Sequence, residues 1–207
     1  DCDFSFNYSG NCDNGIFFRG GNTTVSGCRF VGNYKTGGWG SCVLHVEGSA
    51  TGHVITNCVF ARNGGTGSNE NNATQPGLIC GSNGPTFEFY DCEITNNCSY
   101  STEGYGVPLM AVKGLVMQRC HVAGNQHYAK ALDGRAYSLV GSGYGNSYSM
   151  RIVGSVFDQN LVNVAELKFT AGKYFAGIVG GPGYGIGTVL KDCTFKDNTA
   201  TGLESAG

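Results

Sequence analysis

A nine-residue phrase recurs six times in this chain of 207 residues and constrains the fold more than any other feature. Each copy has an apolar residue, two spacers, a small residue, one spacer, a bulky apolar residue, two spacers and Asn. The copies span residues 25–33, 55–63, 89–97, 117–125, 152–160 and 190–198. Recurrence at intervals of 28 to 38 residues is typical of a solenoid, in which each repeat stacks on the one before it.

The small and bulky positions of the phrase are two residues apart, so they share one face of a strand. The first apolar residue lies three before the small one, which requires a bend between them if both point inward. The small position is occupied by Cys28, Cys58, Cys92, Cys120, Ser155 and Cys193. The bulky position is occupied by Phe30, Phe60, Ile94, Val122, Phe157 and Phe195.

A further apolar strand is expected between consecutive phrases, for example at residues 42–46 and 77–80. Together these segments predict an all-β fold, a parallel β-helix of about six coils with about three short strands in each coil. We expect a single domain over residues 1–207. Residues 1–14 are expected to form an N-terminal cap, residues 15–198 the coils and residues 199–207 a tail.

The last position of the phrase is Asn in every copy. One interpretation is a hydrogen-bonded column of side-chain amides running from coil to coil. The other is a turn residue that tolerates a left-handed backbone. We favour the column, because no other turn-forming residue replaces Asn at these positions: Asn33, Asn63, Asn97, Asn125, Asn160 and Asn198.

Composition excludes several classes of function. Net charge is −2 and no basic block occurs, so no nucleic-acid partner is expected. No apolar run approaches the length of a membrane span. The Gly-rich segments at 141–146 and 180–185 lack the Asp of calcium-binding nonapeptide repeats, and no Cys-x-x-Cys pair occurs, so neither a metal nor another cofactor is expected.

Ten Cys residues in a chain of this length indicate an oxidising compartment. Cys2 and Cys12 could form a local disulfide, and Cys42 and Cys80 could pair between neighbouring coils. The Cys residues of the phrase are open to two interpretations. Stacked coils bring Cα atoms within disulfide range, and free thiols also pack well as small apolar groups.

Four Asn-x-Ser/Thr triplets, at Asn7, Asn22, Asn72 and Asn97, are candidate glycosylation sites. Asn72 lies in the longest polar insertion and is the best candidate. Asn97 is the weakest, because a glycan at the repeated Asn position would disrupt stacking. With the Cys content, these triplets predict a secreted glycoprotein.

Gly-aromatic-Gly triplets place Trp39, Tyr105, Tyr144 and Tyr184 in Gly-rich loops. These rings could cover a sheet face, form a subunit contact or stack on a glycan. We expect the first of these roles, and keep the other two as alternatives.

No catalytic constellation of paired carboxylates emerges from the positions that flank the small residue. Glu93, Arg119 and His121 could lie close together on one face. A solvated polar face is the better interpretation of that cluster, so we do not expect an enzyme.

The segments 28–33, 58–63 and 193–198 resemble the FxxN repeats of right-handed parallel β-helix surface proteins, among them polymorphic outer-membrane proteins and adhesin-like passenger domains. The resemblance implies a right-handed solenoid with an extracellular or cell-surface role in adhesion or assembly. The tail at 199–207 has no amphipathic helix to cover a last coil, so we expect self-association by end-to-end stacking into a fibre or surface layer. The alternative function is a carbohydrate-active or carbohydrate-binding β-helix.

Overall fold

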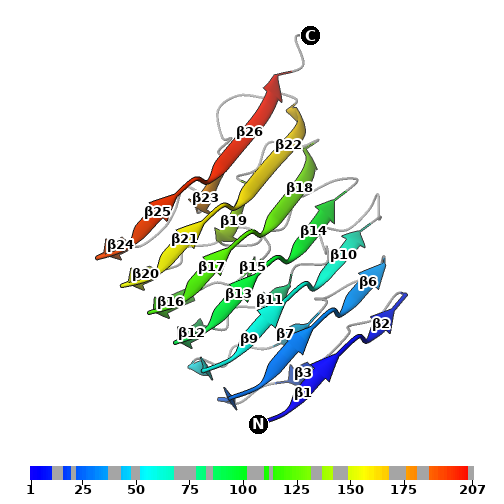
Figure 1. Ribbon diagram of the computed structural model, residues 1–207, viewed down its shortest axis with the longest axis vertical. Coiled ribbons are helices and arrows are strands. Elements are labelled where there is room, and N and C mark those ends of the chain that lie inside the picture. Colours follow the sequence, from blue (N-terminus) through cyan, green and yellow to red (C-terminus); the bar gives the residue numbers. More distant parts are fainter. Residues whose placement is uncertain are drawn as a thin grey trace.

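The computed structural model describes residues 1–10, 16–19, 22–36, 43–47, 52–67, 78–82, 86–101, 110–111, 114–131, 137–141, 149–167, 176–180 and 187–204, and every structural statement below concerns these residues. They form 26 strands arranged in four parallel sheets. Figure 1 shows the coils stacked in order of sequence from the N-terminal to the C-terminal end.

Each coil passes through the four sheets in the same order. Sheet D holds the first apolar residue of the phrase, in β4 (Thr24–Ser26), β8 (His53–Thr56), β12 (Thr86–Tyr90), β16 (Gly114–Gln118), β20 (Met150–Val153) and β24 (Thr188–Lys191). Sheet A holds the bulky residue, in β1 (Asp3–Ser5), β5 (Arg29–Val31), β9 (Val59–Ala61), β13 (Glu93–Thr95), β17 (His121–Ala123), β21 (Val156–Asp158) and β25 (Thr194–Lys196).

Sheet B follows the repeated Asn, in β2 (Tyr8–Ser9), β6 (Tyr34–Thr36), β10 (Gly64–Gly67), β14 (Cys98–Ser101), β18 (Gln126–Ala131), β22 (Leu161–Leu167) and β26 (Thr199–Glu204). Sheet C comes next, in β3 (Ile16–Arg19), β7 (Leu44–Glu47), β11 (Ile79–Ser82), β15 (Met110–Ala111), β19 (Tyr137–Gly141) and β23 (Ala176–Gly180). The parallel β-helix expected from the sequence is confirmed, with four strands in a coil where about three were expected.

Two bends separate sheets D, A and B, and each bend turns on one residue in the left-handed region. The first bend residue precedes the Cys or Ser, as at Asn57 (φ 53°) and Arg119 (φ 52°). The second precedes the repeated Asn, as at Arg62 (φ 55°) and Gln159 (φ 53°). A single left-handed residue reverses the inward parity of the strand, which is why the apolar and small residues can both point inward although they are three apart.

The core is built from columns of like residues. Phe30 and Phe60 stack with ring centroids 4.8 Å apart and planes 3° from parallel, and Phe157 and Phe195 stack at 4.9 Å. These distances match the spacing of neighbouring strands, as expected where parallel strands pair in register. The apolar residues of the phrase are buried throughout the middle coils.

The N-terminal segment is not a cap over its described part, which corrects the expectation for residues 1–14. Residues 2–7 carry the end of the phrase, with Cys2, Phe4 and Asn7 at the small, bulky and Asn positions. Strand β1 pairs in register with β5, and Phe4 stacks on Phe30 at 5.1 Å. The phrase therefore occurs in seven stacked rungs.

The C-terminal segment also differs from the expected tail. Residues Thr199–Glu204 form β26, which pairs in parallel with β22. The coils thus continue through residue 204, the last residue that the structure describes.

Candidate functional site

The Asn side chains form a continuous hydrogen-bonded column at the second bend. In each pair of neighbouring rungs, one Oδ1 accepts from both the backbone N–H and the Nδ2 of the Asn in the preceding coil. For Asn63 and Asn97 these distances are 3.0 Å and 3.0 Å. The same Nδ2 of Asn63 also donates to the carbonyl oxygen of Phe30, at 2.8 Å.

This arrangement repeats from Asn7 to Asn198 with nearly constant distances. The Nδ2–Oδ1 distances between rungs range from 2.8 Å to 3.0 Å. Each Asn from Asn33 to Asn160 therefore joins three coils, through the carbonyl of the coil before it and the Asn of the coil after it. Asp lacks the two donors, and Gln would displace the amide by one methylene, so the geometry explains why Asn fills every rung.

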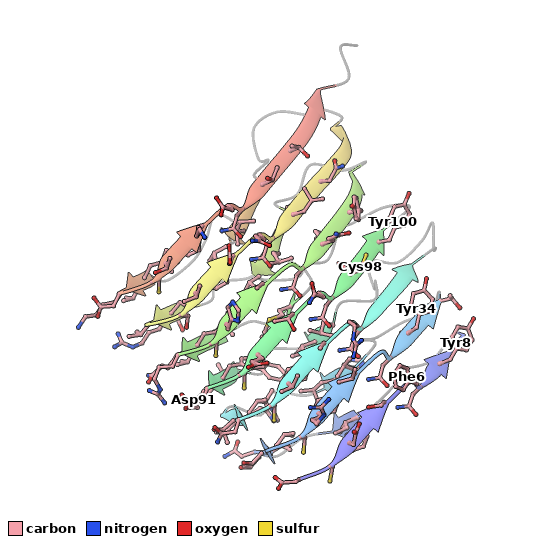
Figure 2. All side chains as sticks on the ribbon, viewed as in Figure 1. Phe6, Tyr8, Tyr34, Asp91, Cys98 and Tyr100 are labelled. Atoms are coloured by element: carbon pink, nitrogen blue, oxygen red, sulfur yellow. The ribbon has the colours of Figure 1, made fainter. Side chains whose placement is uncertain are left out.

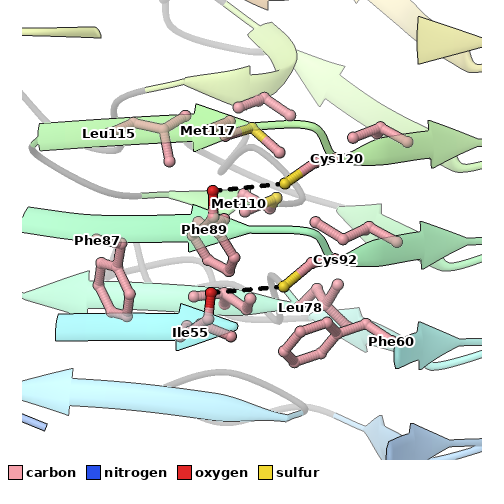
Figure 3. Packing of buried hydrophobic residues seen from close by; sticks show 14 of the residues in the cluster. Ile55, Phe60, Leu78, Phe87, Phe89, Cys92, Met110, Leu115, Met117 and Cys120 are labelled. Atoms are coloured by element: carbon pink, nitrogen blue, oxygen red, sulfur yellow. Dashed lines mark hydrogen bonds between the residues drawn. The ribbon is translucent and has the colours of Figure 1, made fainter. Parts of the chain in front are cut away.

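The Cys side chains form a second column, at the first bend, and their thiols are directed at carbonyl groups of the preceding coil. Cys92 Sγ lies 3.5 Å from the carbonyl oxygen of Ile55 in the preceding coil, and Cys120 Sγ lies 3.5 Å from that of Phe89. Figure 3 shows these two thiols directed at the carbonyls between the packed apolar side chains. The structure has both as buried free thiols. A thiol is a weak donor, so the column holds the bend mainly by packing.

Ser155 shows that a hydroxyl can replace the thiol. Its Oγ accepts from the backbone N–H of Cys120 at 3.1 Å and donates to the carbonyl of Val153 at 3.2 Å. Cys193, in the last coil, lies 3.4 Å from the carbonyl of Ile152. The first bend thus accepts a small side chain with one donor, whereas the second bend accepts only Asn.

Burial and the neighbouring thiols keep Cys92, at the centre of the Cys column, protonated. The adjacent Cys120 and Cys58, together with burial, raise the pKa of Cys92 above that of a free thiol. Burial also raises the pKa of Cys98, at the start of β14. A thiol that stays protonated is a poor nucleophile and a poor metal ligand.

The interior of sheet B contains polar side chains that the sequence pattern did not single out. His127 is fully buried, its Nδ1 lies 2.6 Å from Ser99 Oγ, and its Nε2 has no hydrogen-bond partner among the described residues. Burial lowers the pKa of His127 to about 4. In sheet D, His53 packs against Phe87, and burial lowers its pKa as well. Both imidazoles are therefore neutral at physiological pH.

The outer face of sheets D and A carries charged side chains. Arg119 and Asp91 form a two-pronged ion pair, with both N–O distances at 2.7 Å. This pair occupies the expected neighbourhood of Glu93 and His121, which are register partners on β13 and β17. Arg119 therefore binds the carboxylate of Asp91 rather than completing a cluster with Glu93 and His121. An exposed ion pair of this kind is consistent with a solvated polar face.

The outer face of sheet B carries tyrosines. Tyr8 and Tyr34 lie in one column with ring centroids 6.3 Å apart and planes 11° from parallel. Tyr100 and Tyr128 lie two residues further along the strands, at 6.1 Å. Figure 2 shows Tyr8, Tyr34 and Tyr100 along the same side of the stack.

The structure places three of the four candidate glycosylation sites. Asn97 is buried in the Asn column and both of its Nδ2 donors are engaged, so a glycan there is incompatible with the fold. Asn7 forms the first rung of the column and donates through Nδ2 to Asn33. Asn22 is exposed just before β4, so it is the described triplet whose amide lies outside the column.

Several predicted residues lie outside the described part of the chain: Cys12, Cys42, Asn72, Trp39, Tyr105, Tyr144 and Tyr184. Cys80 belongs to β11, but its side chain is not described. Cys2 is an exposed free thiol at the N-terminal end. The expected disulfides and the roles of the Gly-aromatic-Gly loops therefore stay predictions.

The described residues form neither a metal-binding cluster nor a membrane-spanning helix. No group of three or more His, Cys, Asp or Glu side chains is arranged to hold a metal ion in the described part of the chain. The described ranges contain no helix with the length and apolar character required to cross a bilayer.

Comparison with known proteins identifies the fold family. The family model for the right-handed β-helix region matches residues 1–207, the whole sequence. No curated protein matches the chain significantly. The more specific resemblance to polymorphic outer-membrane proteins and adhesin-like passengers stays a prediction.

Proposed function

The chain belongs to the right-handed β-helix family, and from that premise we propose that it is an extracellular structural solenoid that associates end to end with further copies of itself. The observation that carries this proposal is the surface of the last described coil. Leu190 and Phe195 occupy the apolar and bulky positions of the phrase in this coil, and they are 49% and 43% exposed. The equivalent residues of the preceding coil, Ile152 and Phe157, are fully buried.

The strands of this coil offer the chemistry that a further coil needs. Strands β24, β25 and β26 each pair on one side only, so their other edge presents backbone donors and acceptors. Asn198 Oδ1 accepts the hydrogen bonds of Asn160, and by the pattern of the earlier rungs the backbone N–H of Asn198 would donate to an Asn of a further coil. A coil added in register would extend the backbone pairing and the Asn column together.

The N-terminal coil presents a complementary surface. Strands β1 and β2 also pair on one side only, and Phe4 continues the column that Phe195 ends. A contact between these two unlike surfaces is heterologous, and repetition of such a contact builds an open filament. Secretion is supported by the exposed triplet at Asn22.

The test is a mixing experiment with two variants. Phe195→Lys places a charge on the C-terminal surface, and Phe4→Lys places one on the N-terminal surface. We expect the unmodified chain to form linear particles that lengthen with concentration, by light scattering and electron microscopy. Each variant alone should be monomeric, and an equal mixture should form dimers, because each variant retains one competent end.

Val156→Lys is the matched control, since Val156 is 37% exposed on the side of the same sheet. It should assemble like the unmodified chain, and circular dichroism should show that all variants keep the strand content. A monomeric unmodified chain at high concentration, or mixed variants that do not dimerise, would overturn the proposal.

A catalytic role receives less support from the described residues. The carboxylate of Asp91 is held by Arg119, and that of Glu88 accepts the hydroxyl of Tyr90. The paired carboxylates that glycoside hydrolysis requires would have to be freed from these partners. Carbohydrate binding without catalysis has a separate basis, on the face of sheet B.

A further inference from the structure

The described side chains on the outer face of sheet B differ in charge from those on the outer faces of sheets D and A. Its first outward column contains Tyr8, Tyr34, Gly64, Cys98, Gln126, Leu161 and Thr199. Its second outward column contains Thr36, Tyr100, Tyr128, Asn163 and Thr201 among the side chains that the structure describes. None of these described side chains carries a charge, and the raised pKa of Cys98 keeps its thiol neutral.

Hydrogen bonds of the hydroxyl groups hold two of the tyrosine rings on this face in place. Tyr8 Oη lies 3.1 Å from Thr36 Oγ1, so the ring leans over the next coil. Tyr128 Oη donates to Gln126 Oε1 at 3.2 Å. Rings fixed in this way lose little conformational entropy when a ligand packs against them.

The Tyr34 ring lies beside Gly64 of the following coil. A Cβ on Gly64 would make ordinary contacts of 3.5 Å and 3.6 Å with Cδ2 and Cε2 of Tyr34, and a tighter one of 3.1 Å with the carbonyl oxygen of Cys98. The ring therefore packs within van der Waals reach of the backbone of β10. Tyr34 is still 41% exposed, and Tyr8 and Tyr100 are 69% and 46% exposed.

We propose that the tyrosine face, formed by Tyr8, Tyr34, Tyr100, Tyr128 and the uncharged side chains around them, binds a neutral polysaccharide that runs along the axis of the rod. The C–H faces of a pyranose ring pack on aromatic rings, and its hydroxyls pair with amide and hydroxyl groups such as those of Gln126, Asn163 and Thr36. Neighbouring coils are about 4.8 Å apart, so a polymer that runs along the axis can contact side chains of several rungs at once.

The charge distribution selects a neutral polymer rather than an acidic one. Attraction to an anionic chain would require cations on the face, and the described side chains of its outward columns include none. A second copy of the chain fits this face less well. Its outward columns are rich in hydroxyls and amides and hold Leu161 as their one described aliphatic side chain, which provides little apolar area for a protein interface.

The experiment measures binding of cellohexaose, mannohexaose and a galacturonic acid hexamer by isothermal titration calorimetry. The Phe195→Lys variant serves as the parent, so that end-to-end association does not contribute heat. We expect a neutral hexamer to bind with little dependence on salt, and the acidic hexamer not to bind. Tyr34→Ala and Tyr100→Ala should each weaken binding about tenfold or more, as expected for loss of one ring that stacks on a sugar.

Tyr90→Ala is the matched control, because Tyr90 lies on the charged face of sheet D, bonded to Glu88. It should leave binding unchanged, and circular dichroism should verify the fold of every variant. The proposal would be overturned if neither neutral hexamer bound, if binding survived both tyrosine substitutions, or if salt abolished it. Light scattering that showed these substitutions abolishing dimers of the parent would instead assign the face to a second copy.

Discussion

The two bends that flank sheet A turn the chain in the same way but carry different side chains at the corner. Both turn on one left-handed residue and both place a polar side chain at the corner. At the first bend that side chain is Cys or Ser, with one donor, as in Cys120 and Ser155. At the second bend it is Asn, with two donors and an acceptor that all find partners. The number of hydrogen bonds required at a position sets how many residue types that position tolerates.

The largest expected effect is at the second bend. Asn97→Ala removes the acceptor of Asn63 and the donor to Phe60, which leaves buried backbone groups without partners. We expect a loss of roughly 3–5 kcal/mol in the free energy of unfolding, from about 1–3 kcal/mol for each such group. Urea unfolding followed by circular dichroism measures it.

Asn97→Asp sharpens the same test, because it keeps the shape and the acceptor and removes only the donors. It should be at least as destabilising as Asn97→Ala, since it also buries a charge. Asn22→Asp, at an exposed position, should have no measurable effect. A folded Asn97→Asp protein of unchanged stability would contradict the role assigned to the amide donors.

The next effect is a dependence on pH that arises at neither bend. The folded-state pKa of His127 is about 4, below the ordinary value of 6.5, so unfolding takes up a proton between these values. The contribution of His127 to the free energy of unfolding should be fully present above the unfolded-state pKa. It should fall by about 2 kcal/mol from near pH 6.5 to about pH 5, at about 1.36 kcal/mol for each pH unit.

Thermal unfolding at several pH values measures this loss, and His127→Gln should remove most of it. His53, whose pKa burial also lowers, accounts for any remainder. If the loss on acidification were as large in a His127→Gln, His53→Gln double variant, then a group at one of the bends would have to titrate in this range.

A smaller effect is expected at the first bend. Cys92→Ser should cost less than about 1 kcal/mol, because Ser155 already shows that a hydroxyl fits the position. Cys92→Ala should cost about 1–2 kcal/mol through lost packing. Denaturant unfolding of both variants beside Asn97→Ala compares the two bends directly, and a cost at Cys92 equal to that at Asn97 would show that the bends are equivalent.

The smallest effect concerns the left-handed residues themselves. Arg62→Gly, before the second bend, should gain up to about 1 kcal/mol by relieving backbone strain, less the entropy that Gly loses on folding. Asn57→Gly, before the first bend, should gain less, because Asn tolerates this conformation. Differential scanning calorimetry resolves the difference, and a larger gain at Asn57 would be the opposite of this expectation.

Much of the fold could be predicted from the sequence because the phrase encodes the corner itself. The parity of Ile55 and Cys58 requires a bend, and the structure has that bend at Asn57. The first rung was missed because the apolar position of its phrase would precede residue 1, although Cys2, Phe4 and Asn7 match the remainder. The strand of sheet B was missed because its segments, such as Tyr34–Thr36 and Cys98–Ser101, lack the alternating apolar residues that mark a strand.

The candidate site was less accessible to sequence reasoning. The tyrosines at 8, 34, 100 and 128 are far apart in the chain and follow the Asn at different distances, so only the register of sheet B brings them to one face. His127 is a single histidine within a strand, and its sequence context does not indicate that the side chain is buried. The Gly-aromatic-Gly triplets predicted an aromatic surface from loop residues such as Trp39 and Tyr144, whereas the described aromatic surface is formed by strand residues.

Hydrogen exchange of the Asn side-chain amides, followed by nuclear magnetic resonance, tests the central claim that these amides join the coils. The account predicts strong protection of the Nδ2 protons of Asn63, Asn97 and Asn125, equal to that of the backbone amides of β13, and fast exchange at Asn22. Exchange of the column amides at the rate of an exposed side chain would contradict it.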